Sequence, residues 1–244
     1  MNLTWFDCNC SYGRVARPAP RSAATVPELL AELDWCGIDR ALVYHAGIRA
    51  ASPVSWNPIG AAELYGQARL APAWAILPPS TNELPDFFGA MQAADVRALW
   101  AFPQEHRYRL DLATFRELFP ILERARVPLF AKQNLIPLKE LLTECPNLIV
   151  VAVNQGPHSV ERYLRPLLDD FPNLYLETSG LLVEGVIEEF CARYGAQRLL
   201  FGSGFPDQCL GGALLRLAQA DIGTEARSAI AGGNLERLLA EARL

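Results

Sequence analysis

Side chains that could bind or transform a small molecule stand near the ends of several short apolar runs in the sequence. His45 and Lys132 each close such a run, Glu177 stands one residue from the end of another, and Asp7 lies within the first. Histidine titrates near neutral pH, and a lysine held away from water must find an acidic partner or lose its charge. Such a lysine can anchor an anion, act as a base or form an imine. These residue types favour work on a small anionic or carbonyl-bearing molecule, provided that the fold brings them together.

The apolar runs are spaced like the strands of a parallel α/β protein. Several are continuous Val, Leu, Ile and Ala stretches, which is typical of parallel strands covered by helices. Strand and helix alternate about eight times in 244 residues, so the pattern predicts a single (β/α)8 (TIM) barrel domain over residues 1–244. An open doubly wound sheet is the main rival, but no Gly-x-Gly-x-x-Gly turn follows the first run. The predicted strands are Leu3–Asn9, Arg40–His45, Pro72–Leu77, Ala98–Phe102, Pro128–Lys132, Leu148–Asn154, Leu174–Thr178 and Leu199–Ser203.

Helices are predicted between these strands. Thr25 and Glu28 form a capping box that opens a helix to about Cys36, and Gly37 ends it. The segment 46–70 is rich in Gly, Pro and Ser and is predicted to be the longest loop. The remaining predicted helices span 82–93, 112–125, 137–144, 159–170, 182–194, 209–219, 224–231 and 235–243.

Composition restricts the partners. The net charge is −5, and no cluster of Lys or Arg predicts binding to nucleic acid or to an anionic membrane. No signal peptide and no membrane-spanning apolar run are recognisable, so a cytoplasmic location is expected. The six cysteines are scattered without a CxxC pair, and we expect them to be reduced and mostly buried.

Four segments of the sequence resemble those of the amidohydrolase-related family, which includes metal-dependent decarboxylases and lactonases. The first strand, Asp7-Cys8-Asn9-Cys10-Ser11-Tyr12-Gly13, is similar to the family's Asp-x-His-x-His-x-Gly opening. Phe201-Gly202-Ser203-Gly204-Phe205-Pro206 resembles the final-strand phrase Phe-Gly-Ser-Asp-x-Pro. The stretches 173–180 and 233–239 resemble the seventh-strand phrase and the terminal Gly-Asn helix. The four occur in the family's order along nearly the whole chain.

The resemblance implies five positions at which the family holds its metal, and none keeps the family's residue. They are Asn9, Ser11, Lys132, Asn154 and Gly204. Amide and hydroxyl groups are weak zinc ligands, glycine has no side chain, and an ammonium repels a cation. We therefore expect no resident metal and no other cofactor.

Lys132 and Asp7 are expected to face the same barrel interior and could form an ion pair. The pair could simply fill the space left by a metal, Lys132 could take a catalytic or anchoring role, or it could point to solvent. Cys8 and Cys10 are expected to face outward beneath helices. His45 is the candidate histidine for the pocket, while His106 could line the mouth and His158 could begin a helix.

Three functions remain open at this point. The chain could be a metal-free enzyme using Lys132, His45, Asp7 and Glu177, a non-catalytic binding protein, or a hydrolase with unrecognised metal ligands. We expect a pocket at the carboxyl ends of the strands that accepts a small, possibly anionic molecule. The chain could also form a homo-oligomer. The predicted ligand-binding residues are Asn9, Ser11, Trp100, Asn154, Glu177 and Ser203, with His45 and Lys132 on the same pocket wall.

Overall fold

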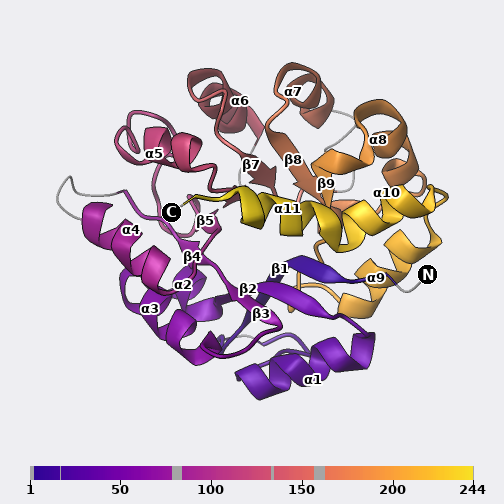
Figure 1. Cartoon of the computed structure of the whole chain (residues 1–244), viewed down its shortest axis with the longest axis horizontal. Coiled ribbons are helices and arrows are strands. Elements are labelled where there is room, and N and C mark those ends of the chain that lie inside the picture. The colour runs from indigo at the N-terminus through magenta and orange to yellow at the C-terminus, as the bar shows by residue number, and fades with distance from the viewer. Residues whose placement is uncertain (1–2, 17, 79–83, 133–134, 157–162, 244) are drawn as a thin grey trace.

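The strands of the protein form a closed parallel barrel. The computed structural model describes residues 3–16, 18–78, 84–132, 135–156 and 163–243. All paired strands are parallel, in the orders β1-β2-β3 and β4-β5-β6-β7-β8-β9 (Figure 1). The strands are β1 (Phe6–Tyr12), β2 (Arg40–His45), β3 (Leu70–Pro72), β4 (Trp74–Ala75), β5 (Leu99–Ala101), β6 (Leu129–Ala131), β7 (Val150–Ala152), β8 (Leu174–Glu177) and β9 (Leu199–Leu200).

Two junctions close the barrel. At Ala73 the chain changes partner, because the Ala73 N–H bonds to Val43 O at 2.8 Å and the Trp74 N–H to Ala98 O at 3.3 Å. The short segments β3 and β4 therefore occupy the third strand position together. Beyond β9 the chain pairs with β1, where Gly204 N donates to Asn9 O at 2.9 Å and Cys10 bridges to Phe205. The predicted (β/α)8 barrel is confirmed.

Most helices connect consecutive strands around the barrel, and the last three follow β9 (Figure 1). The Thr25 side chain accepts a hydrogen bond from Glu28 N at 3.4 Å, and Gly37 ends the helix at φ 72°, as predicted. The helices are α1 (Val26–Cys36), α2 (Ala46–Ala50), α3 (Pro53–Leu64), α4 (Leu84–Ala93), α5 (Leu118–Ala125), α6 (Leu135–Glu144), α7 (Arg165–Asp170), α8 (Val186–Tyr194), α9 (Leu210–Gln219), α10 (Thr224–Ser228) and α11 (Asn234–Glu241). None of the helices described is long and apolar enough to cross a bilayer.

The prediction of a loop over 46–70 was wrong, because α2 and α3 occupy most of it. Pro53 lies at the start of α3, where its missing N–H costs nothing. Asn57 then anchors the helix to the barrel, since its amide donates to Ala75 O and accepts from Ala75 N, both at 2.9 Å. A tertiary contact of this kind outweighs the low helix propensity of Gly and Pro.

The barrel interior and the outer layer form separate apolar clusters. Phe6, Cys8, Tyr44 and Trp100 belong to the interior, whereas Cys10 packs outward. The prediction that Cys8 faces outward was therefore wrong. Cys8 shares the interior face with Phe6 by simple alternation, and the register shift in β1 between Asp7 and Cys10 puts Cys10 on the outer face.

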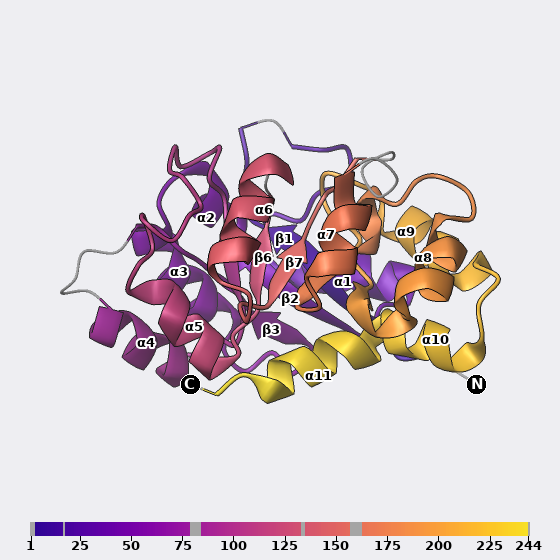
Figure 2. The ribbon, with the colours of Figure 1, turned by 90° about the horizontal axis from the view of Figure 1, so that it is seen from above.

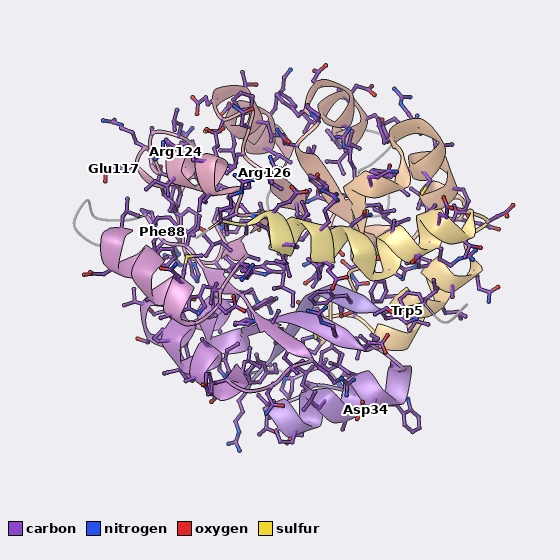
Figure 3. The ribbon with its side chains drawn as sticks, viewed as in Figure 1. Trp5, Asp34, Phe88, Glu117, Arg124 and Arg126 are labelled. Atoms are coloured by element: carbon purple, nitrogen blue, oxygen red, sulfur yellow. The ribbon has the colours of Figure 1, made fainter. Side chains whose placement is uncertain are left out.

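Helix α11 covers one end of the barrel. In Figure 1 it runs across the ring of strands, and in Figure 2 it lies along one side of them. Leu235, Leu238 and Leu239 of α11 join the interior cluster, which Phe6 and Leu42 enter from early positions in their strands. Arg126, labelled beside the end of this helix in Figure 3, forms a 2.6 Å ion pair with Glu241. Ligand access is therefore expected at the opposite end, where the strands finish.

Candidate functional site at the carboxyl ends of the strands

Four of the five positions implied by the family resemblance are joined by hydrogen bonds to one another or to nearby backbone at the carboxyl end of the barrel. Asn9 Nδ2 donates to Asn154 Oδ1 at 3.1 Å, and Gly204 N donates to Asn9 O at 2.9 Å. Ser11 Oγ donates weakly to Phe205 O at 3.4 Å. Asn154 has a left-handed backbone, φ 51°, a conformation that asparagine tolerates better than most residues. This convergence is what the resemblance implied.

Glu177 is the carboxylate at the centre of this network. It is 1% exposed at the end of β8. Its Oε1 accepts from Asn154 N at 2.6 Å and from Ser179 Oγ at 2.6 Å, and its Oε2 accepts from Ser179 N at 2.7 Å. Burial raises the pKa of Glu177 to about 7 against the opposing effect of these hydrogen bonds. Near neutral pH this group can therefore hold or release a proton.

Asp7 is a second fully buried carboxylate at the same end. Its Oδ1 accepts from Ser203 N at 2.8 Å and from Asn9 N at 3.0 Å, and its Oδ2 accepts from Ser203 Oγ. Burial is the main cause of its raised pKa. The predicted pair with Lys132 was wrong, because Asp7 is held against the β9 side of the barrel by Ser203.

Lys132 instead approaches Glu105, with 3.9 Å between Nζ and the carboxylate. It follows Ala131, which packs outward, so alternation directs its side chain to the interior side. The side chain is 35% exposed and that of Glu105 29%. A long, half-exposed pair of this kind is weak, so the ammonium remains available to an incoming anion.

His45 lies outside the barrel interior, which corrects its predicted place in the pocket. It pairs in register with Tyr12 of the outer layer, and its ring stacks on Trp56 of α3 at 4.2 Å. Its Nδ1 accepts from Gly47 N at 3.0 Å and so caps α2. Burial lowers the pKa of His45, which favours the neutral ring whose Nδ1 accepts the Gly47 N–H.

Trp100 points inward as predicted but is completely buried. Its ring stacks on Phe102 and Phe130 at 5.5 and 5.3 Å, and Tyr44 lies 4.8 Å away. Its indole Nε1 has no hydrogen-bond partner among the residues described. Ser203 is also fully buried, with its hydroxyl committed to Asp7 and so unavailable to a ligand. The prediction that these two residues line an open pocket was wrong, because both are covered by neighbouring side chains.

Charged and aromatic residues that sequence reasoning missed complete the mouth. Arg49 on α2 forms a 2.8 Å ion pair with Asp207. The buried Tyr44 phenol lies near Arg49 and Ser11. Strand alternation from Leu42 could have indicated Tyr44, and the position of Ser179 two residues beyond Glu177 could have indicated a capping role. His106 packs edge-on against Phe102, while His158 lies outside the described residues.

The donor set does not suit the metal that the family resemblance implies. Asn9 and Asn154 bind each other, Gly204 offers no side chain, and Lys132 adds positive charge. Both buried carboxylates already accept hydrogen bonds on each oxygen. Within the described parts of the chain, no group of three or more His, Cys, Asp or Glu side chains could hold a metal ion. These groups suit hydrogen bonding to an organic ligand better than coordination of a divalent cation.

Comparisons with known proteins agree with the observed architecture. An uncharacterised TIM-barrel protein from Bordetella bronchiseptica matches at 18% identity and a TM-score of 0.78, over 98% of this chain and 99% of that one. 5-Carboxyvanillate decarboxylase from Sphingomonas paucimobilis matches at 14% identity and a TM-score of 0.74, over 98% and 99%. Dihydroxybenzoic acid decarboxylase from Polaromonas sp. JS666, solved with bound manganese and an inhibitor, matches at 15% and 0.75, over 100% and 98%. At these identities the likeness concerns the fold alone.

The sequence comparison gives a family. A model described as Amidohydrolase matches residues 84–240, which is more than half of the chain. No curated protein matched the sequence.

Proposed function

Because the chain belongs to the amidohydrolase family, we propose that it binds a small carboxylate- or carbonyl-bearing molecule at the carboxyl ends of its strands without a resident metal ion. The observation that carries this proposal is the replacement of the implied metal ligands by a hydrogen-bonded network. Asn9, Asn154 and Ser179 surround Glu177 there, and a lysine stands on the neighbouring strand.

The ligand class follows from the groups that remain able to donate. Lys132 is only weakly paired, and the half-buried Asn154 makes no hydrogen bond through Nδ2 within the described residues. A carboxylate or carbonyl oxygen could accept from both groups. Decarboxylases of 5-carboxyvanillate and dihydroxybenzoate share the fold, so aromatic carboxylates are the first ligands to test.

Proton transfer by Glu177 is a second candidate function, favoured by its pKa of about 7. Ser179 Oγ lies 2.6 Å from Glu177 Oε1 and 2.9 Å from Asn154 Oδ1, so it could connect the carboxyl group to the network. A general acid or base works best when its pKa lies near the working pH. If Glu177 serves only to hold the loop, the protein is a binding protein without catalysis.

A thermal-shift experiment tests ligand binding. Benzoate and 2,6-dihydroxybenzoate are compared with neutral benzamide, because a ligand of the folded state raises the melting temperature. We expect a shift with a carboxylate that is lost in Lys132→Met and kept in Lys139→Met, a matched change on the exposed face of α6. Equal shifts in both variants would contradict the role of Lys132.

Elemental analysis tests the metal. Protein purified without added metal is expected to hold far less than one divalent ion per chain, and chelation should leave the carboxylate shift unchanged. About one zinc or manganese ion per chain, removed together with ligand binding, would overturn the metal-free proposal. A cytoplasmic location is part of the same proposal, since the six cysteines are free thiols.

A further inference from the structure

We propose that Cys36 and Cys209 form a reversible redox pair, a dithiol that closes to a disulfide between α1 and α9 by exchange with a low-molecular-weight disulfide such as oxidised glutathione. The two residues are 173 positions apart in the sequence, 209 minus 36, and neither takes part in the site at the barrel mouth.

The fold brings the two thiols to one place. Cys36 is the last residue of α1, Cys209 is the N-cap residue of α9, and the two helices pack against each other. A Cβ built on Gly211 in the first turn of α9 would lie 3.9 Å from Cys36 Sγ. Both cysteines line one surface pocket of about 350 Å³, together with Arg21, Glu32 and Trp35.

The charges around Cys36 agree with this placement of the two cysteines. Burial raises the pKa of Cys36, and the next cause is the negative charge that Cys209 would carry as a thiolate. Arg21 and the backbone N–H of Gly211 act in the opposite direction and favour the Cys36 thiolate. Arg21 lies close enough to both cysteines for their charges to act on it. A 2.9 Å ion pair with Glu32 holds it there.

Exposure differs between the two thiols in a way that suits sequential exchange. Cys209 is exposed and Cys36 is half-buried, whereas Cys8, Cys10 and Cys145 are buried. The thiolate is the attacking species in such exchange, and access decides which thiol reacts first. Cys209 is therefore the thiol that meets the small disulfide, and Cys36 is the resolving thiol.

The chemistry balances in two steps. The Cys209 thiolate attacks one sulfur of glutathione disulfide, the glutathione S–S bond breaks, and one glutathione thiolate leaves. The Cys36 thiolate then attacks Cys209 Sγ and displaces the second glutathione thiolate. The two protein thiols lose two electrons and two protons, and one glutathione disulfide takes them up to become two glutathione thiols, so no net proton is released.

Closure of this bond would act on the mouth of the barrel. The segment from Phe205 to Cys209 lies between β9 and α9, and it contains Asp207, the ion-pair partner of Arg49. A disulfide at Cys209 would fix this segment to α1. The backbone N–H groups of Phe205 and of residues 207–210 are therefore expected to exchange hydrogen more slowly in the oxidised protein.

Peptide mapping after incubation with oxidised glutathione tests the proposal. In the native chain we expect a linked pair of peptides containing Cys36 and Cys209, with the loss of two hydrogens and reversal by dithiothreitol. Cys36→Ser should instead accumulate a stable glutathione adduct on Cys209. Cys191→Ser, which removes another half-buried thiol on α8, should form the link as the native chain does.

Two results would overturn the inference. One is a native chain in which both cysteines stay free to alkylation. The other is a native chain in which Cys209 keeps a glutathione adduct, since Cys36 then does not resolve it. Both results are read from the peptide map of the native chain alone. The test therefore does not depend on whether the variants fold.

Discussion

At the scale of single residues, the mouth is organised by two buried carboxylates, each of which accepts hydrogen bonds on both of its oxygens. The sequence placed Asn9, Asn154 and Glu177 correctly at one end of the barrel, because strand ends of a parallel barrel converge. The predicted ion pair between Asp7 and Lys132 was wrong, because the irregularity in β1 and the hydrogen bonds from Ser203 depend on neighbours that are distant in sequence. The predicted place of His45 in the pocket was wrong for a related reason, because the last residue of a strand can face outward and cap the next helix.

Glu177 predicts a pH dependence of stability. Its folded-state pKa of about 7 lies above its usual value of 4.5, so the folded protein binds this proton more tightly than the unfolded chain. The resulting stabilisation is fully present below pH 4.5 and is lost as the pH rises to 7, by about 3 kcal/mol. Urea unfolding from pH 4.5 to 7.5 should show this loss.

Two Glu→Gln variants separate the contribution of Glu177 to the pH dependence from that of other groups. Glu177→Gln should flatten the decline, although it should also cost about 1–3 kcal/mol at low pH because an amide NH₂ cannot accept the donated N–H. Glu184→Gln, at an exposed position, should keep the native slope. A Glu177→Gln profile parallel to that of the native chain would refute the assignment.

Ser203→Ala tests the support of Asp7. The substitution removes the hydroxyl donor from Asp7 Oδ2 and leaves that oxygen buried, so we expect a loss of about 1–3 kcal/mol in the free energy of unfolding. Denaturant titration measures it. An Asp7→Asn/Ser203→Ala double variant should lose less than the sum of the single changes, since the two groups contact each other. Strict additivity would argue against the contact.

At the scale of elements, the strands and most helices were predictable because their signals are local. Apolar runs marked the strands, and the Thr25 and Glu28 pair marked the start of α1. Helix α3 was not predictable, since its anchor is Asn57 bound to the backbone of β4. The Cys36 and Cys209 pair was hidden for the same reason, because packing alone brings α1 and α9 together.

Two glycines give opposite expectations at this scale. A Cβ on Gly180 would lie 1.6 Å from Gln155 O, a backbone atom, so Gly180→Ala should cost about 3 kcal/mol or more by shifting the turn after β8. Gly89 in α4 has open space around it, so Gly89→Ala should stabilise by about 0.5–1 kcal/mol. Thermal and urea unfolding of both variants compare these values. Equal effects would show that backbone packing does not constrain the turn.

At the scale of the whole molecule, α11 connects the last part of the chain to the first strands. Asn234 donates to Ala196 O and Leu199 O, each at 2.8 Å, and Leu238 is fully buried in the interior cluster. The helix therefore completes the core that the strands cannot fill alone. A buried leucine of α11 should therefore contribute more to the free energy of unfolding than an exposed leucine on a surface helix.

Leu238→Ala should lower the free energy of unfolding by about 2–5 kcal/mol, because it removes buried methyl groups and leaves a cavity. Leu215→Ala on α9, where the side chain is 57% exposed, is the control and should change stability by about 0.5 kcal/mol or less. Denaturant unfolding monitored by circular dichroism gives both values. Comparable losses in the two variants would show that α11 is not part of the core.

The aromatic stack inside the barrel also has an optical consequence. Trp100 lies 10° from the plane of Phe102 and 21° from that of Phe130, and all three rings are held in a fixed, water-free arrangement. Aromatic rings held in one fixed asymmetric arrangement give a circular dichroism signal in the near ultraviolet. This signal is lost when side-chain packing loosens, even if the helices persist. The near-ultraviolet circular dichroism of the protein therefore reports side-chain packing in the barrel interior, and it can reveal a loss of that packing before the secondary structure unfolds.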